Sequence, residues 1–174
     1  MKTLVILAHP HLPNSTVNQA WSLRLHEEQD VTVHDLYSEY PDFKIDMERE
    51  QKLLLEHDRI VFQFPFYWYS SPSLLKEWQD EVLAYGWAYG SQGTKLHGKE
   101  FMLAVSTGGP EAAYQSGGYN HYSMSELFKP FQAMANLTGM RFLPAFVEHG
   151  VRMLDQEQVN ESAEALIGHI KKDY

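Results

Sequence analysis

The sequence predicts an α/β fold in which a parallel sheet is covered by helices on both faces. Three observations support this prediction. Short apolar runs typical of strands alternate along the chain with segments of helical periodicity. The first apolar run, 4–8, stops at two prolines and is followed at once by a helical pattern, as in a buried strand that leads into a helix. The length of 174 residues suits one domain, which we expect to span 1–174.

Five segments have the residue pattern of β-strands. The first is a continuous apolar run, typical of a strand that is buried on both faces, whereas the second alternates between apolar and polar residues. In chain order, strands are expected at 4–8, 31–37, 59–64, 101–105 and 141–147.

The segments between these strands have the spacing and end signals of helices. Ser71 followed by Pro72 suits the cap and the first position of one helix. Ser123 opens another with capping-box spacing to Glu126, and Pro130 is expected to kink or restart it. In chain order, helices are expected at 15–28, 46–57, 72–83, 123–139 and 157–172.

Strands that alternate with helices imply right-handed βαβ units and a parallel sheet. Five such strands in the order 2-1-3-4-5 form the flavodoxin-like arrangement, in which ligands bind beyond the carboxyl ends of the strands, where the strand order reverses. This rule selects the loops after the first, third and fourth strands, at 9–15, 65–71 and 106–122.

The first loop leads into a helix N-terminus, where unpaired N–H groups and the helix dipole favour an anion. Asn14 or Ser15 is a good N-cap. We expect 15–18 to wrap a phosphate with N–H groups and hydroxyls, with His9 as a further donor. The loop contains no lysine, arginine or glycine, so the donors are neutral and neither common nucleotide-binding motif fits. The alternative is an ordinary capped helix after a buried strand.

The second loop carries four consecutive aromatic residues, Phe66, Tyr67, Trp68 and Tyr69. Four adjacent side chains in a loop cannot all point into one core, so some are expected to line a cleft or an interface. A flat heteroaromatic ligand would stack there. The alternative is a hydrophobic plug beneath the following helix.

The third loop opens with Gly108 and Gly109, which allow a ligand to approach the backbone closely. Downstream, the phenol of Tyr114 and the imidazole of His121 are candidate donors to developing negative charge. Paired glycines also occur in ordinary turns, and His121 has the alternative of a surface histidine. The nine histidines lack metal-ligand spacing, so no metal site is expected.

Composition argues against several classes of protein. Lysine and arginine total 14 against 23 acidic residues, a net charge of −9, which disfavours binding to nucleic acid or anionic lipid. Without cysteine, disulfides and thiolate chemistry are excluded. The start of the chain lacks a signal-peptide pattern and no apolar run spans a bilayer, so a cytoplasmic location is expected.

Four motifs in this order resemble the flavodoxin-like NAD(P)H:quinone oxidoreductases of the DT-diaphorase type. Within that group the small bacterial members are most similar, including the ancillary subunits of glutathione-gated potassium efflux systems. The motifs are A-H-P-x-x-x-x-S-x-x-N at 8–18, F-P-F-Y-W-Y-S-S-P at 64–72, L-K-E-W-x-D at 75–80 and S-T-G-G-P at 106–110.

The resemblance implies a non-covalent flavin, with the chain length favouring FMN over FAD. Two electrons would pass from NAD(P)H through the flavin to a quinone, with ping-pong kinetics, and Tyr114 and His121 would stabilise the reduced flavin. The residues implied for the flavin site are His9, Ser15, Val17 and Asn18 at the phosphate, Pro65, Phe66, Trp68 and Tyr69 at the ring, with Tyr67 in the same aromatic loop, and Ser106, Thr107, Gly108 and Gly109 at the polar edge of the ring.

The resemblance also implies a homodimer in which Trp87 and Tyr89 reach the partner's site. Two other functions stay open. The protein could be a regulatory subunit of a membrane potassium transporter with secondary redox activity, or an electron carrier, although carriers usually have a glycine-rich phosphate loop that is absent here.

Overall fold

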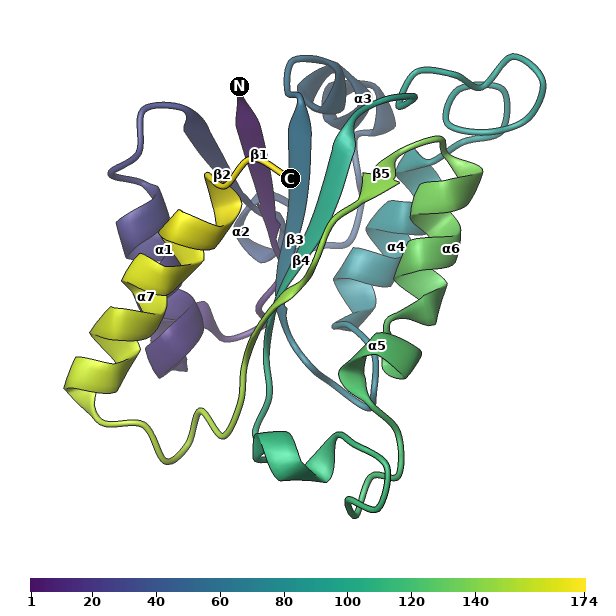
Figure 1. Ribbon diagram of the computed structural model, residues 1–174. Coiled ribbons are helices and arrows are strands. Elements are labelled where there is room, and N and C mark those ends of the chain that lie inside the picture. The colour runs from purple at the N-terminus through teal and green to yellow at the C-terminus, as the bar shows by residue number, and fades with distance from the viewer.

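The computed structural model describes residues 1–174 and has a parallel sheet at its centre. Figure 1 shows the sheet between two groups of helices, with the strands running in one direction. The strand order is β2-β1-β3-β4-β5, with β6 also paired to β4, which confirms the predicted flavodoxin-like order. The strands are β1 (Thr3–Leu7), β2 (Val31–Asp35), β3 (Arg59–Pro65), β4 (Glu100–Ser106), β5 (Arg141–Phe142) and β6 (Phe146–Glu148).

The fifth expected strand, 141–147, is two short strands instead of one. Arg141 pairs with Glu100 at the start of β4, whereas Phe146 pairs with Ala104 near its end. Pro144 lies between them and has no N–H to donate to the ladder, so the pairing is interrupted there.

The second strand is shorter than the expected 31–37. The Asp35 carboxylate accepts hydrogen bonds from the N–H groups of Tyr37 and Ser38, at 3.1 and 3.4 Å, and so starts the short helix α2 (Leu36–Glu39). A cap within the alternating run therefore ends the strand two residues early.

The helices lie in two layers on opposite faces of the sheet. Helices α1 and α7 cover one face, and α4 and α6 cover the other (Figure 1). The helices are α1 (Thr16–Leu25), α3 (Met47–Leu55), α4 (Ser73–Val82), α5 (Met124–Leu127), α6 (Lys129–Leu137) and α7 (Gln156–Ile170), with single 3-10 turns at Leu12–Asn14 and Glu111–Ala113.

Most of the expected helix ends are confirmed. Ser123 and Glu126 form a capping box at α5, and the helix restarts as α6 around Pro130. The expected cap at Ser71 is wrong: Pro72 has an extended ψ of 149° and is itself the N-cap of α4, which has no side-chain cap.

A buried carboxylate joins the helices of one face. Glu50 on α3 accepts hydrogen bonds from His34 Nε2 at 2.9 Å, the Tyr40 hydroxyl at 2.6 Å and Trp78 Nε1 at 2.7 Å. Burial opposes ionisation of Glu50, but these donors outweigh it and hold its pKa below the usual range. The charge is therefore compensated inside the core.

No helix in the structure combines the length and the apolar character that crossing a bilayer requires.

Candidate active site

The three loops selected from the sequence meet at the carboxyl edge of the sheet. The N–H of Phe66 donates to the Ser106 carbonyl at 2.8 Å, which joins the second loop to the third. The side-chain amide of Asn18 donates to the Ser106 hydroxyl, also at 2.8 Å, and joins the first helix to the same point. Both Asn18 and Ser106 are buried, so this contact is protected from water.

A cavity of about 300 Å³ opens at the start of α1. Ser15 caps this helix by accepting a hydrogen bond from the Asn18 N–H at 3.2 Å, whereas the N–H groups of Thr16 and Val17 have no acceptor within the chain. Such unpaired donors at a helix start attract an anion. The lining contains His9, Asn14, Ser15, Thr16, Val17, Asn18, Pro65, Phe66, Tyr67, Ser106, Gly108, Val151 and Arg152.

His9 is a neutral donor at this cavity. Burial lowers its pKa, and the nearby His11 lowers it further. His9 Nδ1 accepts a hydrogen bond from the His11 N–H at 3.1 Å, so in the neutral ring the proton is on Nε2. That N–H is available to a ligand.

Arg152 adds a positive charge that was not predicted from the sequence. It lines the same cavity from the loop after β6, and the position of a Cβ on Gly108 would lie 3.7 Å from its Nε. The other four arginines, Arg24, Arg49, Arg59 and Arg141, each pair with a carboxylate, whereas Arg152 does not. The cavity thus combines a helix N-terminus with an uncompensated cation, as an anionic ligand requires.

A second cavity, of about 220 Å³, adjoins the first, and Phe66 forms part of the wall of both. Its walls are mostly aromatic: Phe66, Trp68, Tyr69, Gly109, Tyr114, Tyr119 and Asn120. The Tyr69 hydroxyl donates to Asn120 Oδ1 at 3.0 Å and joins the second loop to the third across the opening. The cavity at the start of α1, which we call the anion cavity for its unpaired donors and Arg152, therefore lies next to an aromatic slot.

The aromatic turn has an unusual backbone. Tyr67 and Ser70 exchange two backbone hydrogen bonds, and the residues between them, Trp68 and Tyr69, have φ values of 49° and 60°. Left-handed conformations cost bulky residues on the order of 1–3 kcal/mol each and are found mainly at functional sites. The turn holds Trp68 92% exposed at the edge of the aromatic cavity, so this side chain is not a core plug.

The glycine loop presents two backbone donors. The N–H groups of Gly108 and Gly109 bond to no backbone carbonyl, and that of Gly109 lies near the Tyr114 phenol oxygen. The N–H of Thr107, also implied as a donor, bonds to the Glu148 carbonyl at 2.9 Å. A Cβ on Gly109 would lie 2.8 Å from the Tyr119 hydroxyl and 3.2 Å from the Tyr114 ring. A side chain at this position would therefore require the Tyr119 hydroxyl to move and the Tyr114 ring to shift slightly.

The two candidate catalytic residues occupy different surroundings. Tyr114 lines the aromatic cavity, and burial raises the pKa of its phenol. His121 is exposed, lines neither cavity and has a φ of 64°. The imidazole that does contact Tyr114 belongs to His149, whose ring centroid lies 5.3 Å from that of Tyr114.

Residues 149–152 could have been found from the sequence with one further step. They follow the last strand, and the loop after every parallel strand lies at the same edge of the sheet. Only the loops after the first, third and fourth strands were selected from the sequence.

A family model described as the flavodoxin-like fold matches residues 1–172 of the chain. The chain belongs to this family. Among curated proteins it is 59% identical to an uncharacterized NAD(P)H oxidoreductase of Bacillus subtilis, over the whole of both chains. It is 43% identical to the ancillary protein of a glutathione-regulated potassium-efflux system of Yersinia enterocolitica, covering 94% of this chain and 89% of that one.

Solved structures with the same flavodoxin-like fold are also similar. A general stress protein 14 of Treponema denticola, in complex with FMN, is 44% identical and superimposes with a TM-score of 0.94, covering 98% of each chain. An NADPH-quinone reductase of P. pentosaceus is 37% identical, with a TM-score of 0.91 over the whole of both chains.

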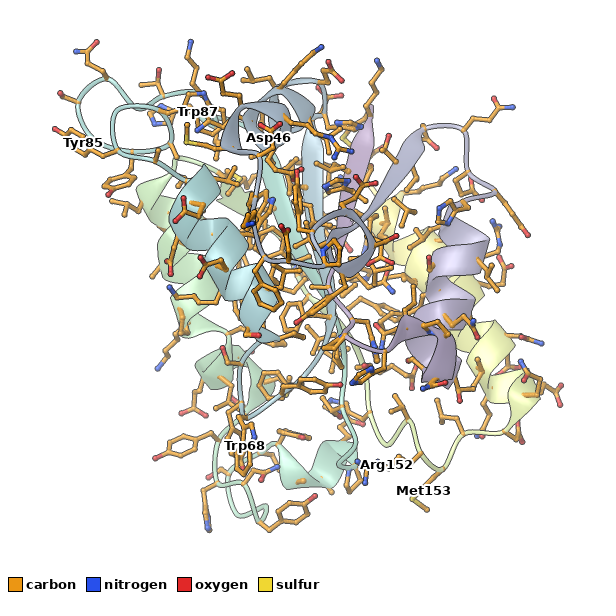
Figure 2. The ribbon with its side chains drawn as sticks, turned by 180° about the vertical axis from the view of Figure 1, so that it is seen from behind. Asp46, Trp68, Tyr85, Trp87, Arg152 and Met153 are labelled. Carbon is orange, nitrogen blue, oxygen red and sulfur yellow. The ribbon has the colours of Figure 1, made fainter.

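The loop that carries Trp87 and Tyr89, which the family resemblance places at a dimer contact, lies far from the two cavities of its own chain. Figure 2 shows Tyr85 and Trp87 at one end of the molecule and Trp68 and Arg152 at the other. Trp87 and Tyr89 are half-buried against the core. Within this flavodoxin-like chain they cannot reach its own cavities, so any contribution to a site has to be made to another copy.

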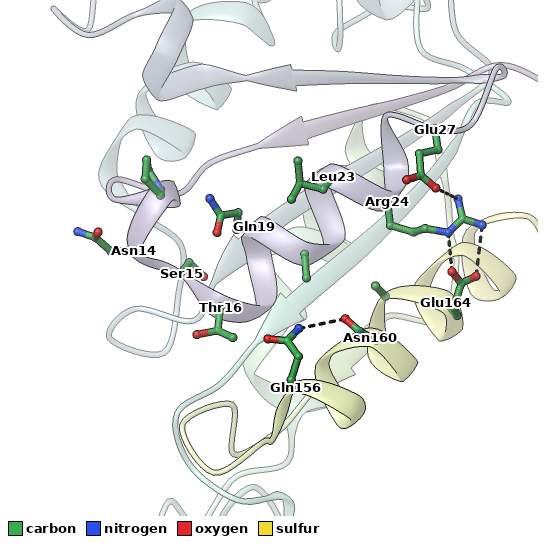
Figure 3. Close-up of a pocket in the computed structure, with 13 residues that line it drawn as sticks. Asn14, Ser15, Thr16, Gln19, Leu23, Arg24, Glu27, Gln156, Asn160 and Glu164 are labelled. Carbon is green, nitrogen blue, oxygen red and sulfur yellow. Dashed lines mark hydrogen bonds and ion pairs between the residues drawn. The ribbon is translucent and has the colours of Figure 1, made fainter.

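A groove of about 460 Å³ between α1 and α7 continues from the anion cavity (Figure 3). The two share Asn14, Ser15 and Thr16. Further along, the Gln156 amide donates to Asn160 Oδ1 at 3.0 Å. Arg24, the only cation in the groove, bonds to Glu164 at 2.6 Å. A ligand extending past the anion cavity would therefore meet amides and a neutralised arginine.

Proposed function

We propose that this protein is an FMN-dependent NAD(P)H:quinone oxidoreductase. The observation that carries the proposal is the pair of adjoining cavities that meet at Phe66. One has the donors that a phosphate needs, and the other has the flat aromatic walls that a planar ring needs.

The residues present fit FMN at both ends. Its phosphate would accept hydrogen bonds from the N–H groups of Thr16 and Val17 and the Ser15 hydroxyl, with Arg152 supplying charge. The N–H groups of Gly108 and Gly109 would bind the polar edge of its ring. The absence of a side chain at Gly109 lets the Tyr114 and Tyr119 phenols lie close to this backbone.

Bound FMN would supply the electron-transfer chemistry, taking two electrons from NAD(P)H and passing them to a quinone. The chain supplies neutral hydrogen-bond donors beside the charge that develops. Because burial raises the pKa of Tyr114, its phenol keeps its proton at neutral pH and can donate. The amides of the glycine loop are fixed in place before the reaction, so they stabilise charge without reorganising.

With the flavin ring in the aromatic cavity, the nicotinamide and the quinone would both bind on the open face of that ring. One face takes one planar ring at a time, so the nicotinamide would leave before the quinone enters. We therefore expect ping-pong kinetics. The names of the similar NAD(P)H oxidoreductase and NADPH-quinone reductase support NAD(P)H and a quinone as the two substrates.

FMN fits the charge pattern better than FAD. The second phosphate of FAD would enter the groove between α1 and α7, where Arg24 is already paired with Glu164. Cofactor released by heat and separated by chromatography is therefore expected to be FMN. Recovery of FAD would show that the groove binds a nucleotide.

The function is tested on the purified protein. After incubation with FMN and gel filtration, we expect a flavin absorption spectrum that bleaches within seconds of adding NADPH or NADH and returns when a simple quinone is added. A colourless protein after loading with FMN and FAD contradicts the cofactor assignment. A yellow protein that NAD(P)H does not bleach contradicts the enzyme assignment alone.

A regulatory role in potassium efflux is a second candidate, supported by 43% identity to an efflux ancillary protein. It predicts tight FMN binding with slow turnover, together with co-purification with a membrane transporter. Fast turnover and no transporter contact would leave the enzyme as the function.

We also propose that the protein forms a homodimer in which Trp87 and Tyr89 contribute to the partner's site. Light scattering should give twice the mass of 20.1 kDa. Trp87→Ala should raise the KM for quinone while FMN stays bound. A monomer with full activity contradicts both statements.

A further inference from the structure

His149 lies behind the glycine loop and is tied to it through the backbone. It follows β6 at the carboxyl edge of the sheet, where the segment 148–151 runs beside 107–109. Three hydrogen bonds hold the two segments together: the N–H of Thr107 to the Glu148 carbonyl at 2.9 Å, that of Gly150 to the Gly109 carbonyl at 2.9 Å, and that of Val151 to the Thr107 carbonyl at 3.1 Å.

The side chain of His149 fixes the hydroxyl of Thr107. His149 Nδ1 lies 2.9 Å from Thr107 Oγ1, and the same oxygen lies 2.9 Å from the carbonyl of Gly109. A carbonyl can only accept, so the single proton of the hydroxyl goes to Gly109. With the hydroxyl donating to Gly109, Nδ1 is assigned as the donor, which puts the proton of the neutral imidazole on Nδ1. This chain of hydrogen bonds ends on the glycine whose N–H faces the proposed flavin ring.

The ring of His149 also covers Tyr114. The two centroids are 5.3 Å apart and the planes are tilted by 30°, whereas Phe66 meets Tyr114 edge-on at 6.1 Å. The phenol is thus held between an imidazole and a phenyl ring at the wall of the aromatic cavity. Thr107 and Tyr114, the two groups in contact with His149, belong to the same loop.

We propose that His149 is the positioning residue for Tyr114 and the glycine loop, and that it provides the imidazole that the family resemblance assigns to His121. Through Nδ1–H it orients Thr107 and the Gly109 peptide, and through its ring it keeps Tyr114 at the cavity wall. This inference rests on the proposed function, because Tyr114 matters only if charge develops beside it.

The carboxylates of Glu111 and Glu148 lie near enough to act on the charge of His149. Burial lowers the pKa of the imidazole and outweighs these two charges, which raise it. The neutral ring with its proton on Nδ1 is therefore the form present at neutral pH.

The first test is a titration of Tyr114 in the FMN-loaded protein, followed by NMR of tyrosine labelled with ¹³C at Cζ. In His149→Ala, water reaches the face of the phenol, so the pKa of Tyr114 should fall. His149→Phe keeps the aromatic cover and should leave this pKa raised. An unchanged Tyr114 pKa in His149→Ala overturns the proposal, and this result does not depend on turnover.

The second test is a double-mutant cycle on the rate of flavin reduction. Tyr114→Phe should slow reduction about ten- to a hundredfold and His149→Ala about tenfold, as expected for loss of a transition-state donor and of its positioning. The part of the His149 effect that passes through Tyr114 is lost once the phenol is gone, so the double variant should be slowed by clearly less than the product of the two single effects. Multiplied effects would mean that His149 acts independently, contrary to the proposal.

Two further variants serve as controls for the double-mutant cycle. His26→Ala removes a histidine at the far end of α1 and should change neither the rate nor the Tyr114 titration. His121→Ala should act independently of Tyr114→Phe, so the slowing of flavin reduction in the double variant should equal the product of the two single effects. If the pair instead shows the coupling expected of His149, the proposal is overturned. If the wild-type protein binds FMN but does not oxidise NAD(P)H, the proposed function fails while the titration still decides the role of His149.

Discussion

At the scale of single residues, Ser15 both caps α1 and lines the anion cavity. Asp and Asn are as good N-caps as Ser, so either replacement keeps the helix start. Ser15→Asp places a negative charge at the phosphate and should weaken FMN binding on the order of a hundredfold. Ser15→Asn, which adds no charge, should bind within severalfold of wild type. Equal retention of FMN by both variants in equilibrium dialysis would remove the phosphate from this cavity.

Arg152 supplies the only charge of the anion cavity, and its neutralisation should have a salt-dependent effect. Arg152→Gln should weaken FMN binding about tenfold at low ionic strength, with a smaller loss in roughly 0.5 M salt because the exposed pair is screened. Arg152→Lys should recover part of the affinity. Fluorescence quenching of FMN measures the affinity of each variant at both salt concentrations. An equal affinity of the wild type and the two variants would place Arg152 outside the site.

At the scale of an element, the two glycines of the glycine loop, Gly108 and Gly109, differ in the space that a side chain would find. Neither glycine has a positive φ, so a substitution there tests space alone. Gly109→Ala puts a Cβ 2.8 Å from the Tyr119 hydroxyl and 3.2 Å from Tyr114, so these phenols must move. Gly108→Ala makes only an ordinary contact with Arg152 at 3.7 Å. We expect Gly109→Ala to slow flavin reduction about tenfold and Gly108→Ala to cost less. The reverse order in stopped-flow traces would contradict the proposed role of Tyr114.

At the scale of the whole molecule, buried ionisable groups should make the fold sensitive to acid. Burial lowers the pKa of His9 and His149 below 6.5, so the unfolded chain binds protons that the native state does not. Stability is therefore lost as the pH falls below 6.5. Glu50, whose native pKa is lowered, extends the loss below its unfolded value of 4.5. Asp35, whose pKa burial raises, acts in the opposite direction at the acid end.

Urea unfolding checks this sign. The free energy of unfolding should be lower at about pH 5 than at about pH 7, and the double variant His9→Gln, His149→Gln should show a flatter dependence between these values. A stability that rises as the pH falls would contradict the directions assigned to both histidines.

The sequence by itself determined the order of strands and the edge of the sheet where the site lies. Apolar runs and prolines act locally, so β1, the cap at Ser15 and the aromatic loop could be predicted from neighbouring residues. The two-part last strand was missed because the apolar pattern continues across Pro144, and only the missing N–H interrupts the ladder.

Only the tertiary structure decided which distant side chains lie beside the proposed site. Arg152 and His149 are separated by many residues from Ser15 and Tyr114, and no periodicity links them; the pairing of β6 with β4 brings them to the same edge. His121 is close to Tyr114 in sequence, yet it is exposed and lines neither cavity. Contacts between segments depend on the register of the sheet, which is a property of the packed chain rather than of any one stretch of it.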